Sequence, residues 1–285
     1  MNWNKQDTKI VIVGLGLIGG SYARALKKKD FYVMAIDTNR DSIDYALREG
    51  LIDEGSTDTS LLHKADVIIL ALYPTQVVDW VKMHRTEFAK NVRITDVTGI
   101  KSAIVYEIQD LLGDNAEFIA AHPMAGREVQ GVQNSDDAIF TNANYIVVPT
   151  EKNTPEAVAW CRELGGLLGF SRICELSPKE HDRMIAFVSQ LTHCIAVSLM
   201  TCEDDENIRD YTGDSFRDLT RIANINEDMW TELFFMNREA LLDRLDLFIN
   251  EMETIREMIR KEDTEGLKEK MRLSTRRRKR FNRDE

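Results

Sequence analysis

The sequence predicts an α/β domain built on a doubly wound parallel sheet, followed by an all-helical C-terminal domain. Short apolar runs alternate with helical patterns as far as residue 176, which is typical of a parallel sheet covered by helices on both faces. All five prolines lie at or before Pro178, and of the fifteen glycines only Gly213 and Gly266 lie beyond it. Because proline and glycine interrupt helices, the remaining chain favours long helices. We therefore expect a first domain over residues 1–176 and a helical domain over residues 177–285.

The first domain alternates between seven candidate strands and connecting helices. Several of the strands are continuously apolar, as strands buried on both faces must be. The predicted strands are Lys9–Val13, Tyr32–Asp37, Val67–Leu72, Val92–Asp96, Phe118–Ala121, Tyr145–Pro149 and Arg172–Leu176. The clearest helices are Ser21–Lys29, Asp41–Glu49, Thr75–Ala89 and Ser102–Leu112.

Composition limits the partners and the compartment. The net charge of −11 argues against nucleic acid as the main partner, and we interpret the basic run at residues 276–280 as a solvated helix end. No apolar run approaches the roughly 20 residues that span a bilayer, and no signal segment is evident, so no membrane association is expected. The four cysteines lack CxxC spacing. We therefore expect a cytoplasmic protein with reduced cysteines and no metal site.

A glycine-rich loop predicts a Rossmann-like dinucleotide site. The strand Lys9–Val13 runs directly into a G-x-G-x-x-G segment, after which a helix begins. Gly14 permits the tight turn, Gly16 lets the backbone approach a pyrophosphate, and Gly19 lets helix and strand pack closely. The phosphates then lie at the helix N-terminus. The loop residues expected to bind the cofactor are Gly14, Gly16, Leu17, Ile18 and Gly19.

An acidic residue after the second strand predicts which cofactor binds. Asp37 follows Gly14 by 23 positions (37 minus 14), close to the separation expected for a ribose-binding carboxylate. A carboxylate at this point accepts hydrogen bonds from the ribose hydroxyls of NAD and repels the 2′-phosphate of NADP. Arg40 is near enough to weaken this preference, but NAD remains the predicted cofactor.

One histidine occupies a position where chemistry is expected. The predicted strand Phe118–Ala121 ends in His122-Pro123, followed by a glycine-bearing loop. Ligands of open α/β sheets gather beyond the carboxyl ends of the strands. The position therefore favours a functional His122 over the alternative, a histidine packed in the core.

Separated segments resemble the prephenate and arogenate dehydrogenases of tyrosine biosynthesis. The glycine loop is generic to dinucleotide enzymes, but two other segments are specific to this family. They are residues 122–128 (His-Pro-Met-Ala-Gly-Arg-Glu) and residues 216–223 (Phe-Arg-Asp-Leu-Thr-Arg-Ile-Ala) followed by Met229-Trp230. Residues 189–193 (Ser-Gln-Leu-Thr-His) match more loosely. Together the segments extend over almost the whole chain.

The resemblance implies an NAD-dependent oxidative decarboxylation of prephenate to 4-hydroxyphenylpyruvate. Hydride leaves C4 of the substrate for the nicotinamide while the C4 hydroxyl loses its proton. Loss of the ring carboxylate as carbon dioxide then makes the ring aromatic. A neutral histidine is a suitable proton acceptor near pH 7, so we assign this role to His122.

The resemblance also implies which residues hold the substrate. Arg221 is expected to bind a substrate carboxylate through its guanidinium fork. The alternative is an ion pair with Asp218 on the same helical face. His193 is expected at the pyruvyl end of the substrate, with Ser189 from the same segment nearby. Glu128 is expected to gate the site or to support its ligands.

Two departures from the family pattern concern the substrate. Many relatives bind the C4 hydroxyl with a serine at the position of Gly99, so Thr98 or Ser102 replaces it here, or the histidine acts alone. Relatives are often glycine-rich where this chain has Asp214. If Asp214 points into the pocket, it pairs with the ammonium group of arogenate, whereas an N-capping Asp214 leaves substrate choice unchanged. We predict prephenate as the substrate, with arogenate as the alternative.

Two other functions stay open at the level of sequence. A β-hydroxyacid dehydrogenase or an imine reductase would share the glycine loop, but such enzymes commonly rely on a lysine in the helical domain. An NAD-sensing regulator would bind the cofactor without turnover and use its basic C-terminus on nucleic acid. Nothing in this sequence matches the signatures of those enzymes, and a regulator would not require His122 and Arg221 together.

The helical domain carries more large apolar residues than one helix face can hold. Residues 229–249 include a dense series of Met, Trp, Leu, Phe and Ile. Such a composition predicts helices buried on more than one face. The family resemblance adds a homodimer formed through this domain, with a twofold axis.

Overall fold

The computed structural model of the chain describes Trp3 and residues 7–281. These residues belong to two compact units, residues 1–238 and residues 239–285. The first unit carries the sheets and every predicted site residue. The second unit is helical.

The first unit contains a parallel sheet of six strands, which confirms the predicted fold class. The strands are β1 (Lys9–Val13), β2 (Tyr32–Ile36), β3 (Glu54–Ser56), β4 (Val67–Leu70), β5 (Val92–Asp96) and β6 (Ala116–Phe118). Their order across the sheet is β3-β2-β1-β4-β5-β6. The sequence order of the strands runs one way from β1 to β3 and the other way from β4 to β6, as in other doubly wound sheets. The bounds of β1 and β5 agree with the predictions, whereas the short edge strand β3 lies outside them.

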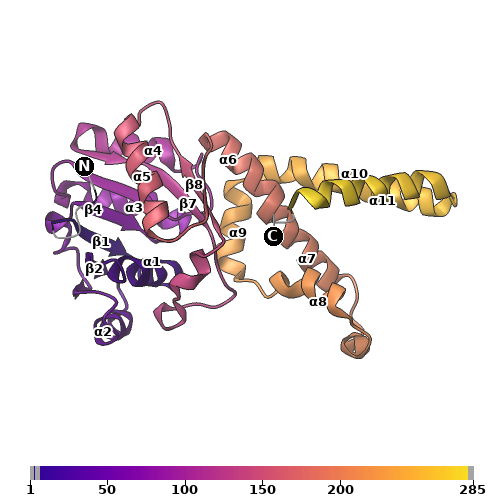
Figure 1. Cartoon of the computed structure of the whole chain (residues 1–285), viewed down its shortest axis with the longest axis horizontal. Helices are drawn as coiled ribbons and strands as arrows, with labels where there is room; N and C mark the ends of the chain where they lie inside the picture. Colours follow the sequence, from indigo (N-terminus) through magenta and orange to yellow (C-terminus); the bar gives the residue numbers. More distant parts are fainter. Residues whose placement is uncertain (1–2, 4–6, 282–285) are drawn as a thin grey trace. The chain divides into compact units, whose positions relative to one another are not determined.

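Helices on both faces of this sheet create two apolar cores (Figure 1). The helices are α1 (Leu17–Lys27), α2 (Arg40–Arg48) and α5 (Pro155–Leu167) in one core, and α3 (Pro74–His84) and α4 (Val105–Leu112) in the other. Within β1, Ile10 and Ile12 face the first core, whereas Val11 and Val13 face the second. Burial on both sides requires an apolar residue at every position, which explains the uninterrupted apolar runs in the sequence.

The prediction of a single strand over Phe118–Ala121 is wrong, because the segment is divided between two sheets. β6 ends at Phe118, whose carbonyl oxygen accepts hydrogen bonds from the side-chain amides of Gln109 (3.3 Å) and Asn153 (2.8 Å). The N–H of Ala121 donates to a carboxylate oxygen of Asp96 (3.2 Å) instead of to a strand. The N–H of Ile119 still donates to the carbonyl oxygen of Ile94 in β5 (3.0 Å), but side chains bond the backbone groups on either side of it.

A second, three-stranded sheet begins where β6 ends. Its strands are β7 (Ala120–Met124), β8 (Asn144–Val148), which is antiparallel to β7, and β9 (Arg172–Glu175), which is parallel to β8. His122 lies in the middle of β7, opposite Ile146. The predicted position of His122 beyond the carboxyl end of a strand is therefore wrong, although His122 still follows the main sheet in sequence.

Every described element after β9 is helical, as predicted. In the first unit these elements are α6 (Pro178–Ile185), a π-helical turn (Ala186–Gln190), α7 (Leu191–Thr201), α8 (Asp214–Thr220), α9 (Glu227–Met236) and short 3-10 turns. α6 starts at a capping box, in which Ser177 and Glu180 each accept a hydrogen bond from the other's backbone N–H. The π-helical turn joins α6 and α7 into one continuous helix.

This continuous helix, Pro178–Thr201, has the length and hydropathy of a membrane span. Its residues 184–201 carry no charged side chain, and the mean hydropathy of the most apolar window is 1.6. The prediction that no apolar run approaches this length is therefore wrong for this segment. Apolar helices in the cores of globular proteins have the same length and composition. In this helix the polar side chains of Gln190 and His193 bind other residues of the same unit.

The second unit is a hairpin of two helices. α10 (Arg238–Arg260) begins at the last residue of the first unit. The N-cap of α11 (Thr264–Arg278) is Asp263, whose carboxylate accepts a hydrogen bond from the N–H of Gly266 (3.0 Å). An ion pair between Glu251 and Lys270 links the two helices. The basic run falls at the end of α11, which confirms the predicted helix end. Large apolar side chains are exposed on both helices, among them Leu242, Leu247, Ile249, Met252, Ile259 and Met271.

Candidate active site

The glycine loop between β1 and α1 leaves space in front of the helix. Gly14 has a φ of +95°, and an added Cβ would lie 2.4 Å from the carbonyl oxygen of Ala71. A Cβ added to Gly19 would lie 1.9 Å from the carbonyl oxygen of Gly14, whereas one added to Gly16 would meet nothing within 4 Å. Gly14 and Gly19 therefore close the turn, and Gly16 borders open space before Leu17, the first residue of α1. This arrangement fits a pyrophosphate bound at a helix N-terminus.

Alanine substitutions should separate these glycine roles. We expect Gly19→Ala to lower the melting temperature, because the new Cβ collides with backbone and overpacking of this kind costs about 1–3 kcal/mol. Gly16→Ala should keep the wild-type melting temperature but bind the dinucleotide more weakly, because its methyl group enters the phosphate space. Thermal melts and calorimetric NAD titrations of both variants test this. Wild-type NAD affinity in Gly16→Ala would contradict the assignment.

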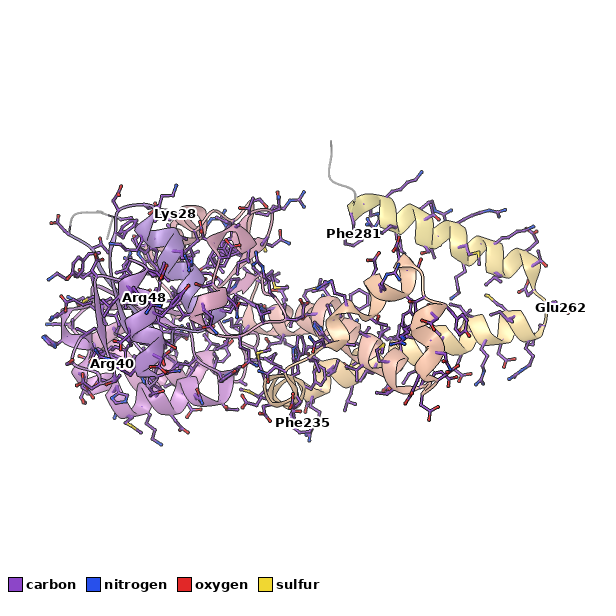
Figure 2. All side chains as sticks on the ribbon, turned by 90° about the horizontal axis from the view of Figure 1, so that it is seen from below. Lys28, Arg40, Arg48, Phe235, Glu262 and Phe281 are labelled. Atoms are coloured by element: carbon purple, nitrogen blue, oxygen red, sulfur yellow. The ribbon has the colours of Figure 1, made fainter. Side chains whose placement is uncertain are left out.

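Asp37 lies directly after β2, beside the same loop. Its carboxylate accepts hydrogen bonds from the N–H groups of Leu15 (2.6 Å) and Asn39 (2.7 Å). Asp37 therefore anchors the glycine loop, in addition to the ribose-binding role predicted for it. Arg40 pairs with Asp44 (2.9 Å) on α2 and lies at the surface (Figure 2). Because its guanidinium binds Asp44, Arg40 is less able to weaken the preference for NAD over NADP.

His122 is held by two residues of α6. Its Nδ1 lies 2.9 Å from Nε2 of His181, and Nδ1 of His181 lies 2.8 Å from Oδ1 of Asp182. His181 is fully buried, and Asp182 is 5% exposed. The other ring nitrogen of His122, Nε2, faces Gly99, where an added Cβ would lie 3.9 Å away. This nitrogen of His122 thus adjoins Gly99, the position at which the family resemblance leads us to expect a serine.

Desolvation favours a neutral His122, which is partly buried. Desolvation lowers the pKa of His122 well below its ordinary value, and the neighbouring His181 and Lys101 act in the same direction. Desolvation also lowers the pKa of His181, although Asp182 opposes this shift. A histidine with a depressed pKa carries no charge at neutral pH and can accept a proton.

A buried ion pair supports the strand that carries His122. Nζ of Lys101, which is fully buried, donates to Oδ2 of Asp96 (2.6 Å) and to the carbonyl oxygen of Ala121 (2.6 Å). The hydroxyl of Thr98 bonds to the same carboxylate, and Thr98 is only 3% exposed. These contacts favour a structural role for Thr98 over the predicted contact with the substrate hydroxyl.

Three of the predicted substrate-binding residues, Glu128, Ser189 and Arg221, lie close to a fourth, His193. The guanidinium Nη1 of Arg221 lies 2.5 Å from Oε1 of Glu128, so Arg221 pairs with Glu128 rather than with Asp218. His193 is close enough that the charges of Glu128 and Arg221 influence its pKa, which desolvation lowers. The ring of His193 lies against Trp230, with centroids 3.6 Å apart, and its Nδ1 donates to the carbonyl oxygen of Ser189 (2.9 Å). An arginine–glutamate ion pair therefore lies close to a histidine that packs against an aromatic ring.

Asp214 is directed to its own helix. It is the first residue of α8, and its Oδ1 accepts a hydrogen bond from Nη2 of Arg217 (2.6 Å). Its side chain is 91% exposed. The N-cap of α8 is Gly213, so the expectation that Asp214 caps the helix is wrong in this detail. A carboxylate in the first turn still interacts favourably with the helix dipole.

The sequence interpretation missed His181 and Asp182. The signal was a histidine and an acid adjacent to one another, four and five positions after the N-cap Ser177 of a helix. In isolation such a pair is an ordinary feature of a helix surface. Only the fold brings it to His122, which lies 59 residues earlier in the chain.

Known proteins resemble this chain over nearly its whole length. A family model described as the nucleotide-binding domain of prephenate dehydrogenase matches residues 22–169, and one described as its dimerization domain matches residues 177–273. The prephenate dehydrogenase of Bacillus subtilis is 32% identical over 274 residues, which cover 93% of this chain and 73% of that protein.

Solved structures agree with this comparison. The crystal structure of prephenate dehydrogenase from A. aeolicus in complex with hydroxyphenyl propionate and NAD+ has a TM-score of 0.88 and 27% identity, covering 96% of this chain and 98% of that one. The Synechocystis arogenate dehydrogenase has a TM-score of 0.83 and 27% identity, covering 96% and 100% of the two chains. Both similarities extend through the helical part as well as the sheets.

Proposed function

The chain belongs to the prephenate dehydrogenase family, and from this premise we propose that it oxidises and decarboxylates prephenate to 4-hydroxyphenylpyruvate with NAD, in tyrosine biosynthesis. The observation that supports the proposal is that one site contains both a neutral histidine, which can accept a proton, and an arginine, which can bind a carboxylate. His122 has its Nε2 on the side of Gly99, and Arg221, which lies near His193, pairs with Glu128.

The residues have separate tasks in this reaction. NAD, when bound at the glycine loop and Asp37, supplies the hydride acceptor. Nε2 of His122 accepts the proton of the C4 hydroxyl, which lets the hydroxyl oxygen become a carbonyl oxygen as the hydride leaves. Arg221 exchanges Glu128 for a substrate carboxylate, and His193 adds a hydrogen bond at the same end.

Substrate choice is the part of the proposal that an assay decides directly. Purified protein is incubated with prephenate or arogenate and with NAD or NADP, and the absorbance of reduced nicotinamide is followed. We expect prephenate with NAD to give the highest kcat/KM, because Asp214 pairs with Arg217 on its own helix and the carboxylate of Glu128 pairs with Arg221. A higher kcat/KM for arogenate would show that arogenate is the preferred substrate. If neither prephenate nor arogenate is turned over, the proposed function is wrong.

Asp37→Ser should weaken NAD binding and relax the preference for NAD over NADP. The substitution removes the charge that repels a 2′-phosphate, and it removes the anchor of the loop at Leu15. The measurement is the ratio of kcat/KM for the two cofactors. An unchanged ratio would exclude Asp37 as the ribose ligand.

We also propose that the protein forms a homodimer through residues 177–285. We place the end of the first domain near residue 176 and the enzyme in the cytoplasm. The name of the second family model and the exposed apolar residues of this region support it. Phe235 is 73% exposed and lies at the surface (Figure 2). Light scattering should give about twice the chain mass of 32.7 kDa. A double variant, Leu247→Glu with Ile249→Glu, should shift the protein toward the monomer, and a wild-type monomer at micromolar concentration would contradict the proposal.

A further inference from the structure

We propose that His181 and Asp182 are positioning residues that fix the proton-accepting tautomer of His122 and stabilise the charge it acquires. This inference rests on the proposed function and adds two residues to it. Neither residue has a task in the mechanism given above. Both are buried, and both lie on α6, whereas His122 lies on β7.

The three side chains form a continuous hydrogen-bonded chain. Nδ1 of His122 lies 2.9 Å from Nε2 of His181, and Nδ1 of His181 lies 2.8 Å from Oδ1 of Asp182. The Asp182 carboxylate also accepts hydrogen bonds from the N–H groups of Lys101 (2.9 Å) and Ser102 (2.8 Å). Asp182 is therefore fixed from two sides, and its position determines that of His181.

The positions of the protons follow from this geometry. Burial raises the pKa of Asp182, but the hydrogen bonds from His181 and Ser102 outweigh this effect and lower it, so the carboxylate is ionised and can only accept. Nδ1 of neutral His181 must then carry its proton, which leaves Nε2 of His181 as an acceptor. Nδ1 of His122 must carry a proton to bond with that acceptor. Nε2 of His122 is left with a lone pair, on the side of Gly99.

The same hydrogen bonds, from His122 to His181 and from His181 to Asp182, stabilise His122 after it has accepted a proton. During the reaction the O–H bond of the substrate hydroxyl breaks, an N–H bond forms at Nε2 of His122, and the hydride passes to the nicotinamide. His122 then becomes a cation in a poorly hydrated position, which is costly without a compensating charge. Its Nδ1–H donates to His181, which is polarised by the carboxylate of Asp182. The arrangement resembles a carboxylate that orients a histidine in a catalytic triad, with one more imidazole inserted.

Further hydrogen bonds connect the backbone of Asp182 to α9 and to the π-helical turn. Nδ2 of Asn237 donates to the backbone carbonyl oxygen of Asp182 (2.9 Å) and to Oε1 of Gln190 (2.8 Å), and Nε2 of Gln190 donates to the carbonyl oxygen of Leu233 (2.8 Å). Asn237 and Gln190 are both buried. The segment that carries His181 and Asp182 is therefore held at its backbone as well as at its side chains.

Nuclear magnetic resonance tests the tautomers without requiring turnover. The chain has five histidines, so a sample labelled with ¹⁵N only in histidine gives few signals, which His→Gln or His→Asn variants assign. Long-range ¹⁵N–¹H spectra at neutral pH should show both His122 and His181 protonated at Nδ1. Protonation of either ring at Nε2 instead would overturn the proposal. Because no substrate is needed, this result stands even if prephenate is not the substrate.

Kinetics test the effect on the reaction. We expect His181→Leu to lower kcat for prephenate roughly 10- to 100-fold, as the loss of partners that orient reactive histidines does elsewhere, with KM within a few fold. His181→Gln should recover part of the loss, because its amide oxygen can accept the hydrogen bond from His122. His84→Leu is the matched control, since His84 also pairs with a carboxylate, Glu87, but lies at the end of α3. It should keep wild-type kcat.

A double-variant comparison distinguishes positioning from general structure. If His181 acts through His122, then His181→Leu should cost little further activity in a His122→Asn background. Loss by the same factor in both backgrounds would show a merely structural role and would overturn the proposal. A wild-type protein that turns over neither prephenate nor arogenate would instead refute the proposed function. The inference about His181 and Asp182 would then be tested by the ¹⁵N–¹H spectra alone.

Discussion

His122→Asn should lower kcat for prephenate by about 100- to 10,000-fold, the range usual for loss of a general base, while KM changes only a few fold. The lost interaction acts mainly in the transition state, where the hydroxyl proton moves, so ground-state binding is largely preserved. Asparagine retains a polar side chain at the middle of β7 and can still bond to His181. Steady-state formation of reduced nicotinamide measures the effect.

Two controls make this result interpretable. The NAD dissociation constant of His122→Asn should equal that of the wild type, and His63→Asn, at an exposed histidine outside the site, should keep wild-type turnover. Near-normal turnover in His122→Asn would remove His122 from the mechanism.

The acid limb of the pH profile should carry the same signature. His122 is active when neutral, and desolvation depresses its pKa in the folded protein. Activity should therefore persist as the pH falls through the ordinary histidine value of about 6.5 and be lost only at lower pH. The profile of kcat/KM reports the free enzyme and is the one to measure. A limb above pH 6.5 would contradict the depressed pKa.

Arg221→Gln should raise KM for prephenate by roughly 10- to 150-fold, since a hydrogen bond to a charged group contributes about 1.5–3 kcal/mol. Glutamine cannot supply the charge or the paired N–H groups of the guanidinium fork. Arg221→Lys should lie between the wild type and Arg221→Gln, because it keeps the charge but not the fork.

The neighbours of Arg221 provide matched comparisons. Glu128→Gln should lower KM or leave it unchanged, because it removes the carboxylate that competes with the substrate for Arg221. Arg217→Gln removes a similar arginine, on α8, that pairs with Asp214, and should not affect KM. An unchanged KM in Arg221→Gln would show that the substrate carboxylate binds elsewhere.

The sequence predicted those parts of the fold in which a local pattern and the tertiary environment agree. β1 and β5 are apolar and buried on both faces, and their bounds match the predictions. β3 is three residues long, contains Gly55 and lies at the sheet edge, so neither propensity nor periodicity marks it. The division of residues 116–124 between two sheets depends on side chains of Gln109 and Asn153, which a linear pattern does not reveal.

The site was predicted where a motif specifies backbone geometry and missed where partners are distant in sequence. The glycine loop has the conformation that its spacing requires, including the positive φ of Gly14. Arg221, by contrast, pairs with Glu128, 93 residues away, and not with Asp218 on its own helix. His181 and Asp182 belong to the same class of omission, because their role depends on where β7 runs.

The π-helical turn at Ala186–Gln190 determines the angular phase of the helix that crosses the site. His181 and His193 are twelve positions apart (193 minus 181), and in a regular α-helix, at about 100° per residue, they would point roughly 120° apart. A π-helical turn takes up one extra residue, so the two histidines have the phase of eleven steps and diverge by only about 20°. One added residue therefore turns His181, which bonds to His122, and His193, which lies near Arg221, toward the same side of a single helix.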